Sequence, residues 1–164
     1  MNANSTPAIP GRVASLHLHP INAGATLHPV EAIDVVAKQG IQGDTRYFGR
    51  RSRDTGAWSR RQVTLIEREQ LAEHATALGL PEIPSGKVRS NIETTGISLI
   101  SLLGQEVEIG SAILLLYAPR DPCAKMDAIC QGLRALMLNN RQGVLAEVVR
   151  SGTIRVGDAI KPRT

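Results

Sequence analysis

The stretch Gly104–Cys123, GQEVEIGSAILLLYAPRDPC, indicates the fold class of this chain. Residues 106–109 alternate charged and apolar side chains before Gly110, the pattern of a half-buried strand that ends in a turn. Residues 113–117 are apolar without interruption, as in a strand that is covered on both faces. The stretch then reaches a turn where we expect a helix to begin. Two adjacent strands of this kind predict a sheet-rich domain.

Working outward, the same reasoning predicts a mainly β protein. Short strands are expected at 12–19, 31–38, 61–66, 91–94, 144–150, 153–156 and 159–161. Only two segments have helical patterns, at 67–78 and at 122–138. Strands that follow one another without regular helices between them favour a closed barrel or sandwich of about eight or nine short strands with two helices. We expect residues 1–10 to be a flexible tail and residues 11–164 to form a single domain.

The composition excludes several classes of protein. With 164 residues, 42% hydrophobic and 21% charged, the chain is long enough for one core and is not of a disordered type. Two cysteines exclude a disulfide scaffold and a four-cysteine zinc site, and the four histidines lack the spacing of metal ligands. No apolar run approaches the ~20 residues that span a bilayer, and the N-terminus does not resemble a secretory signal. We expect an intracellular, cytoplasmic protein that does not bind membranes.

Arginine dominates the basic residues. The net charge is +4, from 15 Arg and 4 Lys against 15 acids, and six of these arginines lie between positions 46 and 61 with one acid, Asp54. A tight turn, residues 40–44, precedes them and ends in Asp44. Such a turn followed by arginine side chains could bind a phosphate, although Arg50, Arg51 and Arg53 are equally well explained as solvated charges. Because Arg60 and Arg61 open a strand, one of them should face the barrel interior or its mouth.

Cys123 is the strongest candidate for chemistry. We expect Asp121 to cap the helix, Pro122 to take its first position and Cys123 to lie in its first turn. That position, together with the basic Arg120 and Lys125, would lower the pKa of the thiol and favour the reactive thiolate. The alternative is a small buried thiol. Cys130 belongs to the apolar stripe of the same helix and is expected in the core.

A weaker signal lies at residues 87–92, KVRSNI. If this stretch is extended, Arg89 and Asn91 point to the same side and could both donate hydrogen bonds to a polar ligand. Surface placement is the default interpretation of such a pair.

Seven short motifs then occur in a fixed order along the chain. They are Gly-x-x-Gly-Asp from residue 40, Arg-Gln-Val-Thr-Leu-Ile from 61, Arg-Ser-Asn-Ile from 89, Leu-Gly-x-x-Val-x-Ile-Gly from 103, Asp-Pro-Cys from 121, Arg-Gln-Gly-Val from 141, and Gly-x-Ile-x-Val-Gly-Asp from 152. In this order they resemble the MOSC domain, the C-terminal domain of molybdenum cofactor sulfurases, which also occurs as stand-alone bacterial proteins. The resemblance covers about residues 25–162 and implies a β-barrel.

The resemblance also implies functions for individual residues. In this family the cysteine that matches Cys123 is thought either to carry sulfur as a persulfide or to be a ligand of molybdenum in the pterin cofactor. Active members reduce N-hydroxylated compounds. The arginine-rich region would face the cofactor phosphate, and Arg61, Arg89 and Asn91 match family positions near the cofactor. We include Arg46, Arg60 and Asp44 in the predicted cofactor-binding set.

The chain departs from the larger family members in ways that predict its partners. It lacks the pyridoxal-phosphate desulfurase domain, so we expect no pyridoxal phosphate, and it lacks the extra N-terminal β domain of the amidoxime-type reductases. It contains no redox domain. A small-molecule reductase would therefore need an external electron donor, and a sulfur carrier would need a cysteine desulfurase.

Binding of nucleic acid or an acidic partner through residues 46–61 is a third hypothesis. The charge of this segment permits it. However, the whole chain has only four aromatic residues on which bases could stack, which argues against nucleic acid as a partner.

Overall fold

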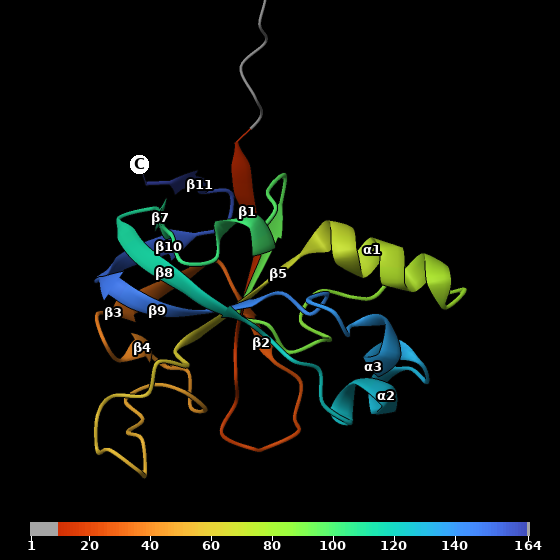
Figure 1. Ribbon diagram of the computed structural model, residues 1–164, viewed down its shortest axis with the longest axis horizontal. Coiled ribbons are helices and arrows are strands. Elements are labelled where there is room, and N and C mark those ends of the chain that lie inside the picture. The colour runs from red at the N-terminus through yellow and green to blue at the C-terminus, as the bar shows by residue number, and fades with distance from the viewer. Residues whose placement is uncertain (1–9, 164) are drawn as a thin grey trace, which may run out of the picture.

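A computed structural model of the chain describes residues 10–163, which fold around a closed β-barrel (Figure 1). Seven strands form the barrel, in the order β1, β6, β5, β9, β8, β7 and β11, and pairing of β11 with β1 closes it. An eighth strand, β2, pairs with β1 outside the ring. The bounds are β1 Gly11–Leu18, β2 His28–Val30, β5 Val63–Glu67, β6 Ile92–Thr95, β7 Glu106–Ile109, β8 Ala112–Pro119, β9 Val144–Arg150 and β11 Ala159–Pro162. The predicted mainly β barrel is thus confirmed.

The stretch that begins at Gly104 forms the β7–β8 hairpin. Its strands pair antiparallel, from Glu106 opposite Leu115 to Ile109 opposite Ala112. β8 then pairs with β9 over most of its length, with two irregularities in register. Ala112, Leu114 and Leu116 of β8 belong to the barrel core and Ile113 is also buried, whereas Leu115 and Tyr117 are half-buried. The continuous apolar run thus has one fully buried face and one that is only partly covered.

One connection in the barrel is a parallel crossover. β5 and β6 pair in parallel, and the chain between them contains helix α1, Arg68–Ala77. Parallel neighbours need a long connection because the chain must return to the starting edge, and a helix commonly supplies it. The predicted helix at 67–78 is therefore confirmed, with a difference of one residue at each end.

A second, three-stranded sheet packs against the barrel. It has the order β10 (Gly152–Arg155), β3 (Ala32–Val36) and β4 (Gly40–Ile41). Buried Ile33, Val35, Ile41 and Ile154 from this sheet belong to the same apolar cluster as the barrel interior. Removal of this apolar area from water is the main contribution that holds the two sheets together.

A second apolar cluster lies between the barrel and its helices. It unites Ile66 of β5 with Leu71 of α1 and with Met126, Leu133 and Met137. This cluster fixes the segment after β8, and with it the position of Cys123, against the barrel wall.

The predicted single helix at 122–138 is wrong. The chain forms two short helices, α2 (Lys125–Ile129) and α3 (Leu133–Leu136). Cys130 is extended and Gly132 has a φ of 94°, a left-handed conformation that glycine adopts without strain and that breaks a helix. Part of the apolar stripe is buried on both sides of the break, because Met126 before it and Leu133 and Met137 after it belong to one apolar cluster.

Within the described residues the structure has eleven strands, more than the eight or nine expected. The additional ones, β2 and β4, have three and two residues, and a run that short has no measurable periodicity. A short 3-10 helix, Ile100–Leu102, was also not predicted. The predicted tail lies almost wholly outside the described residues. None of the helices in residues 10–163 has the length and apolar character needed to cross a bilayer.

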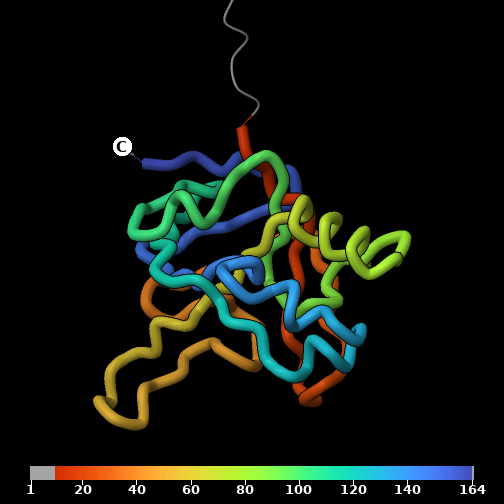
Figure 2. Tube along the Cα trace, turned by 45° about the vertical axis from the view of Figure 1, so that its right-hand side comes forward, coloured from red at the N-terminus to blue at the C-terminus, as the bar shows by residue number. Residues whose placement is uncertain are grey.

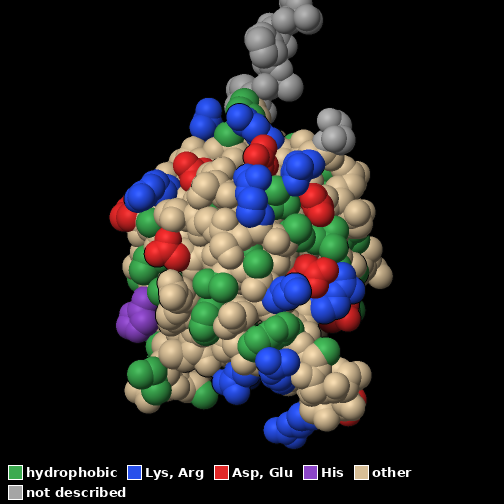
Figure 3. Space-filling model, turned by 90° about the vertical axis from the view of Figure 1, so that its left-hand side faces the viewer, with side chains coloured by type: hydrophobic (Ala, Val, Ile, Leu, Met, Phe, Trp, Pro, Cys, Tyr) green, Lys and Arg blue, Asp and Glu red, His purple; other side chains and the backbone are tan. Residues whose placement is uncertain are grey.

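The loops that carry the candidate residues gather at one end of the barrel. The β1–β2 loop, the long loop between β4 and β5 and the segment with α2 lie at the lower end in Figures 1 and 2, whereas β11 and the start of β1 lie at the upper end. On the face shown in Figure 3, the lower end carries mainly basic side chains, while basic and acidic ones alternate higher up. The barrel thus brings distant basic segments together around one mouth.

Candidate functional site

A cavity of about 510 Å³ opens at this end of the barrel and contains the Cys123 thiol. Its lining comes from three separate segments, namely the loop after β4, the start of β5 and the chain around α2 and α3. The lining residues are Arg46, Tyr47, Arg61, Arg120, Asp121, Cys123, Lys125, Met126 and Gln142. Four of these nine side chains are cationic and only Asp121 is acidic, so the cavity is suited to an anion.

Cys123 lies before α2 rather than within it. The helix begins at Lys125 with Ala124 as its N-cap, so the predicted capping by Asp121 and the first-turn position of Cys123 are wrong. The backbone carbonyl of Cys123 accepts a hydrogen bond from the Met126 N–H, at 3.0 Å, which forms a turn ahead of the helix. The side chain of Met126 is buried and fixes this turn on the barrel. Cys123 itself is exposed, which contradicts the alternative of a buried thiol.

Arg120 is the most unusual residue of the cavity. It is only 8% exposed, and its Nη1 donates to the Ser90 hydroxyl at 3.0 Å. No carboxylate of residues 10–163 forms an ion pair with it. Burial lowers the pKa of Arg120 to about 10, opposed by Tyr47 and Cys123 and reinforced by the charges of Arg61 and Arg89. A buried guanidinium without a carboxylate is costly unless an anionic ligand pairs with it.

Two further buried polar atoms in the same cavity lack partners. They are Nε of Arg61 and Oε1 of Gln142, neither of which has a hydrogen bond in the described part of the chain. The other end of the Gln142 amide donates to the Met126 sulfur at 3.6 Å. Because the great majority of buried polar atoms in folded proteins are hydrogen-bonded, two such atoms on residues that line one cavity indicate a place for a ligand.

Tyr47 stands between this cavity and a second one of about 350 Å³. The Arg46 Nε donates to the Tyr47 hydroxyl at 3.3 Å, and the guanidinium of Arg61 lies 5.2 Å from the ring centroid. Burial raises the pKa of Tyr47, but the hydrogen bond from Arg46 and the charges of Arg61, Arg120 and Arg46 outweigh it, so the pKa is lowered from 10.0.

The second cavity and a third of about 340 Å³ adjoin the first. The second is lined by His19, Pro20, Ile21, Ala23, Thr45, Arg46, Tyr47, Arg50 and Arg89. The third shares Arg89 with the second and Lys125 with the first, and it includes the apolar side chains of Leu27 and Ile129. The three cavities therefore surround one mouth, with cations at each boundary.

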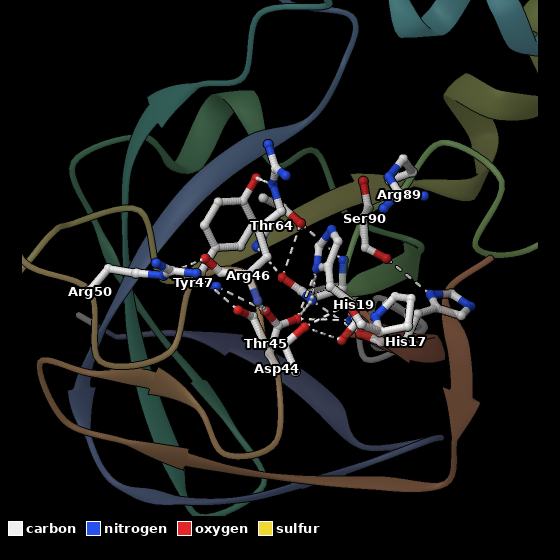
Figure 4. Close-up of polar contacts among 12 residues, drawn as sticks. His17, His19, Asp44, Thr45, Arg46, Tyr47, Arg50, Thr64, Arg89 and Ser90 are labelled. Atoms are coloured by element: carbon white, nitrogen blue, oxygen red, sulfur yellow. Dashed lines mark hydrogen bonds and ion pairs between the residues drawn. The ribbon is translucent and has the colours of Figure 1, made fainter. Parts of the chain in front are cut away.

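Beneath the second cavity, Asp44 organises a buried polar network (Figure 4). Its carboxylate accepts hydrogen bonds from the backbone and Nδ1 of His19 at 3.1 and 2.8 Å, and from Nδ2 of Asn91 at 2.9 Å. It also accepts hydrogen bonds from the backbone N–H groups of Arg46 and Tyr47, at 3.0 and 3.1 Å. Asp44 was predicted to bind the cofactor, and the structure instead shows its oxygens occupied in fixing the loop that carries Arg46 and Tyr47.

Asn91 is the second member of this network. Its Oδ1 accepts the N–H and the hydroxyl of Thr64, both at 3.1 Å, and its Nδ2 also donates to the His17 carbonyl at 3.1 Å. It is fully buried and lines none of the three cavities. Its amide therefore joins β1, β5 and β6, and does not face the ligand space.

The assumption that residues 87–91 are extended is also wrong. β6 begins only at Ile92, and Arg89 has a φ of 67°, so Arg89 and Asn91 do not share a side. Arg89 nevertheless lines the second and third cavities, while its Nη1 donates to the Ala25 carbonyl at 2.9 Å. The Glu93 carboxylate accepts hydrogen bonds from Arg68 Nη1 and from the Gly86 N–H, both at 2.7 Å. These two bonds anchor the loop that contains Arg89.

Of the two arginines that precede β5, only Arg61 faces the cavity. Arg60 is exposed, binds Glu147 through two hydrogen bonds of 3.2 and 3.0 Å and stacks on the Tyr117 ring at 4.2 Å. It lines none of the described cavities. The prediction that one arginine of this pair points at the mouth holds for Arg61, whereas the Arg60 guanidinium forms an ion pair with Glu147.

Arg51 and Cys130 line none of the three cavities, whereas Arg50 lines the second. In the 46–61 loop, Arg51 pairs with Trp58 in an isolated bridge and stacks on its ring at 3.7 Å. Cys130 is half-buried against the helix cluster, so its predicted core position is only partly met.

Sequence reasoning did not select Arg120, Tyr47 or Gln142 as ligand-binding residues. Arg120 had been noted only as a basic neighbour of Cys123, although a charged residue directly after a continuous apolar strand was a usable signal. Gln142 belongs to one of the recurring motifs, and Tyr47 is one of four aromatic residues in the chain. Their common location depends on tertiary contacts between distant segments.

Comparison with known proteins agrees with this geometry. A model of the MOSC domain matches residues 32–161, most of the chain. The chain belongs to the MOSC domain family. This family is linked to molybdenum cofactor binding and to metal–sulfur biosynthesis.

Relatives and solved structures support the same assignment. YuaD of Bacillus subtilis (strain 168), described as a putative metal-sulfur cluster biosynthesis protein, is 26% identical over 144 residues, with 74% of this chain and 75% of that protein covered. A crystal structure of the Bacillus subtilis YuaD protein superposes with a TM-score of 0.79 at 23% identity and covers 93% of this chain and 94% of that one. The crystal structure of YiiM from Geobacillus stearothermophilus superposes with a TM-score of 0.73 at 18% identity and covers 94% of this chain and 76% of that one. At such identities the structural likeness shows the fold.

Proposed function

We propose that this MOSC protein binds the molybdenum cofactor at the Cys123 cavity and acts as an oxidoreductase on N-hydroxylated or related small compounds. The observation that carries the proposal is the buried Arg120 without a carboxylate partner, beside an exposed thiol in the same cavity. The cofactor is an anion with a soft metal. Guanidinium groups bind phosphate through paired donors, and thiolates are suitable ligands for soft metals.

The residues present fit such a ligand. Arg61, with its unpartnered Nε, and Arg120 would hold the pterin phosphate, and Arg46 and Lys125 add charge at the opening. The free Oε1 of Gln142 can accept a hydrogen bond from a pterin N–H group. Arg61 Nε and Gln142 Oε1 would each gain a hydrogen-bond partner, and Arg120 would gain an anionic partner in addition to the Ser90 hydroxyl.

Cys123 would be the protein's ligand to the metal. Residues 10–163 contain no group of three or more His, Cys, Asp or Glu side chains that could hold a metal ion. A metal bound here would therefore take its other ligands from the pterin. When bound, the cofactor supplies the two-electron chemistry, and the protein orients it and the substrate.

Metal and pterin analysis tests this proposal. The protein is produced in a host that makes the cofactor, and molybdenum per chain and pterin fluorescence are measured. We expect both in the unchanged protein, loss of at least tenfold in Cys123→Ser, and retention in Cys130→Ser as the matched control. Because Cys123 is exposed, its substitution should alter the free energy of unfolding by less than about 0.5 kcal/mol. Correctly folded protein without molybdenum and pterin would refute the proposal.

A second candidate is a sulfur carrier that holds sulfur as a persulfide on Cys123. Two observations favour it: the thiol is exposed, and a relative is described as a putative metal-sulfur cluster biosynthesis protein. In this function the Cys123 thiolate takes sulfane sulfur from a cysteine desulfurase and passes it to an acceptor.

Mass spectrometry distinguishes this candidate. Incubation with a cysteine desulfurase and cysteine should add about 32 Da, one sulfur, to the peptide that contains Cys123. The peptide that contains Cys130 should remain unmodified. No addition, or addition at Cys130 alone, would exclude the carrier function.

A further inference from the structure

Tyr47 forms the wall between two of the cavities at the barrel mouth. It lines both the Cys123 cavity and the second cavity, which also contains His19 and Arg50. Its backbone N–H is held by Asp44 at 3.1 Å, and its ring contacts the edge of His19 at a centroid distance of 5.3 Å. Asp44 therefore fixes the backbone of Tyr47 from below, as Figure 4 shows, while the residue lines both cavities.

The hydroxyl of Tyr47 accepts a hydrogen bond but gives none. Arg46 Nε donates to it at 3.3 Å. Among residues 10–163 there is no acceptor for the hydroxyl proton. A phenol that is already engaged as an acceptor and lines a ligand cavity has its proton free for whatever molecule occupies that cavity.

The surroundings of the ring favour release of that proton. Arg46 and Arg61 lie 5.7 and 5.2 Å from the ring centroid, and the charge of buried Arg120 also acts on the phenol. The other titratable groups around it are His19, the more distant Tyr117, and the side chains that line the two cavities with it, namely Arg50, Arg89, Asp121, Cys123 and Lys125. Asp121 is the single carboxylate among these lining residues, and Asp44 binds the backbone N–H of Tyr47 rather than its phenol. Positive charge on several sides stabilises the phenolate relative to the phenol.

We propose that Tyr47 is a catalytic proton donor of this site, whose hydroxyl hydrogen-bonds to the substrate in the Cys123 cavity and gives it a proton during the reaction. The inference rests on the proposed function, because it takes this cavity as the place of reaction.

The proton balance follows from reduction of an N–OH compound. The N–O bond breaks, two electrons arrive from the external donor, and two protons are consumed, so that R–NH–OH yields R–NH2 and water. One proton passes from the Tyr47 hydroxyl to the departing oxygen and the other comes from solvent. Water in the second cavity then returns a proton to the phenolate, for which the position of Tyr47 between the two cavities is suited.

The chain has two tyrosines, which allows a direct test without cofactor. In Tyr117→Phe, Tyr47 is the only tyrosine, and its ionisation is followed by absorbance at 295 nm. We expect the midpoint of the Tyr47 titration to lie below pH 10 and to move to higher pH when sulfate binds to the arginine side chains of the cavity. A midpoint at or above 10 without sulfate, or one that sulfate does not move, would overturn the proposal.

Sulfate affinity gives the reciprocal measurement. The charge of sulfate does not change in this range, so its affinity for the Tyr117→Phe protein should fall severalfold as pH rises through the Tyr47 midpoint. In the double variant Tyr47→Phe/Tyr117→Phe, the part of the decrease in sulfate affinity that is caused by ionisation of Tyr47 should be absent. Any decrease that remains in the double variant comes from the titration of Arg120. Equal pH dependence in both proteins would contradict a hydroxyl that faces the ligand.

Kinetics of the cofactor-loaded protein complete the test. Tyr47→Phe should lower kcat by roughly 100-fold, a typical contribution of general acid catalysis, and change KM less than threefold. Tyr117→Phe is the matched control and should retain kcat. An unchanged kcat in Tyr47→Phe would overturn the proposal. The titrations need no molybdenum, so failure to load the cofactor would refute the proposed function and leave the Tyr47 measurements interpretable.

Discussion

The Asp44 network and the Cys123 cavity share the loop with Arg46 and Tyr47, yet their polar atoms are satisfied in opposite ways. The Asp44 carboxylate accepts five hydrogen bonds and is fully enclosed. In the cavity, Arg61 Nε and Gln142 Oε1 lack partners and Arg120 lacks a carboxylate. The first arrangement stabilises the fold. The second reduces stability and is expected where a ligand will complete it.

The comparison separates positioning residues from binding residues. The residues predicted to bind the cofactor were Asp44, Arg46, Arg60, Arg61, Arg89 and Asn91. Of these six, only Arg46, Arg61 and Arg89 line the cavities at the mouth. The motif that ends in Asp44 therefore acts on the site by holding the following two residues in place.

The largest expected effect is that of Asp44→Ala on stability. The substitution leaves the His19 side chain, the Asn91 amide and three backbone N–H groups without their acceptor, and loss of one partner from a buried pair commonly costs roughly 3 to 5 kcal/mol. Urea denaturation measures the free energy of unfolding. A loss below about 1 kcal/mol would show that the network is not the stabilising region.

The same residue predicts sensitivity to acid. Burial raises the pKa of Asp44, but hydrogen bonds and charge interaction with His19 and the Tyr47 N–H outweigh it, so the folded pKa lies below 3.8. A depressed carboxyl pKa contributes stability that is present above the unfolded value and is lost as pH falls through the folded value. Denaturation midpoints measured from pH 6 to pH 2 should therefore fall below about pH 4 in the unchanged protein. In Asp44→Asn, the part of the acid-induced loss of stability that comes from protonation of Asp44 should be absent. An equal decline of the denaturation midpoint in both proteins would contradict the stabilising role of the Asp44 carboxylate.

Arg120→Met tests the opposite region. Because the guanidinium is buried without a carboxylate, an apolar side chain of similar length should leave the free energy of unfolding unchanged or raise it by roughly 1 to 3 kcal/mol. Sulfate affinity, measured by isothermal titration calorimetry, should fall at least tenfold. A protein that is destabilised and retains its affinity would reverse the roles assigned to the two regions.

The smallest expected effect distinguishes adjacent arginines. Arg60→Ala removes an exposed ion pair with Glu147, which is worth about 0.2 to 1 kcal/mol, and should leave sulfate affinity unchanged. Arg61→Ala should weaken sulfate binding severalfold because its guanidinium faces the cavity. Equal losses of affinity in the two variants would mean that the cavity extends to the outer surface at Arg60.

Most of the barrel could be predicted because its strands carry their own pattern. Alternation in β7 and the unbroken apolar run of β8 each arise from contacts along one strand, so a few consecutive residues are enough to indicate them. The break at Gly132 was not predicted, since the apolar spacing continues across it and only the backbone conformation reveals the separation of α2 from α3. The short β2 and β4 exist through pairing with longer neighbours and have no pattern of their own.

The sequence by itself determined the barrel class, the arginine-rich segment and the singular position of Cys123, because composition and local periodicity are properties of adjacent residues. Only the tertiary structure decided which cations face that thiol, since Arg61, Arg120 and Arg46 come from segments far apart in the chain. It also decided that Asp44 and Asn91 are occupied and that Arg60 is paired with Glu147. Whether a polar group is free depends on its three-dimensional neighbours, and no pattern along the chain encodes them directly.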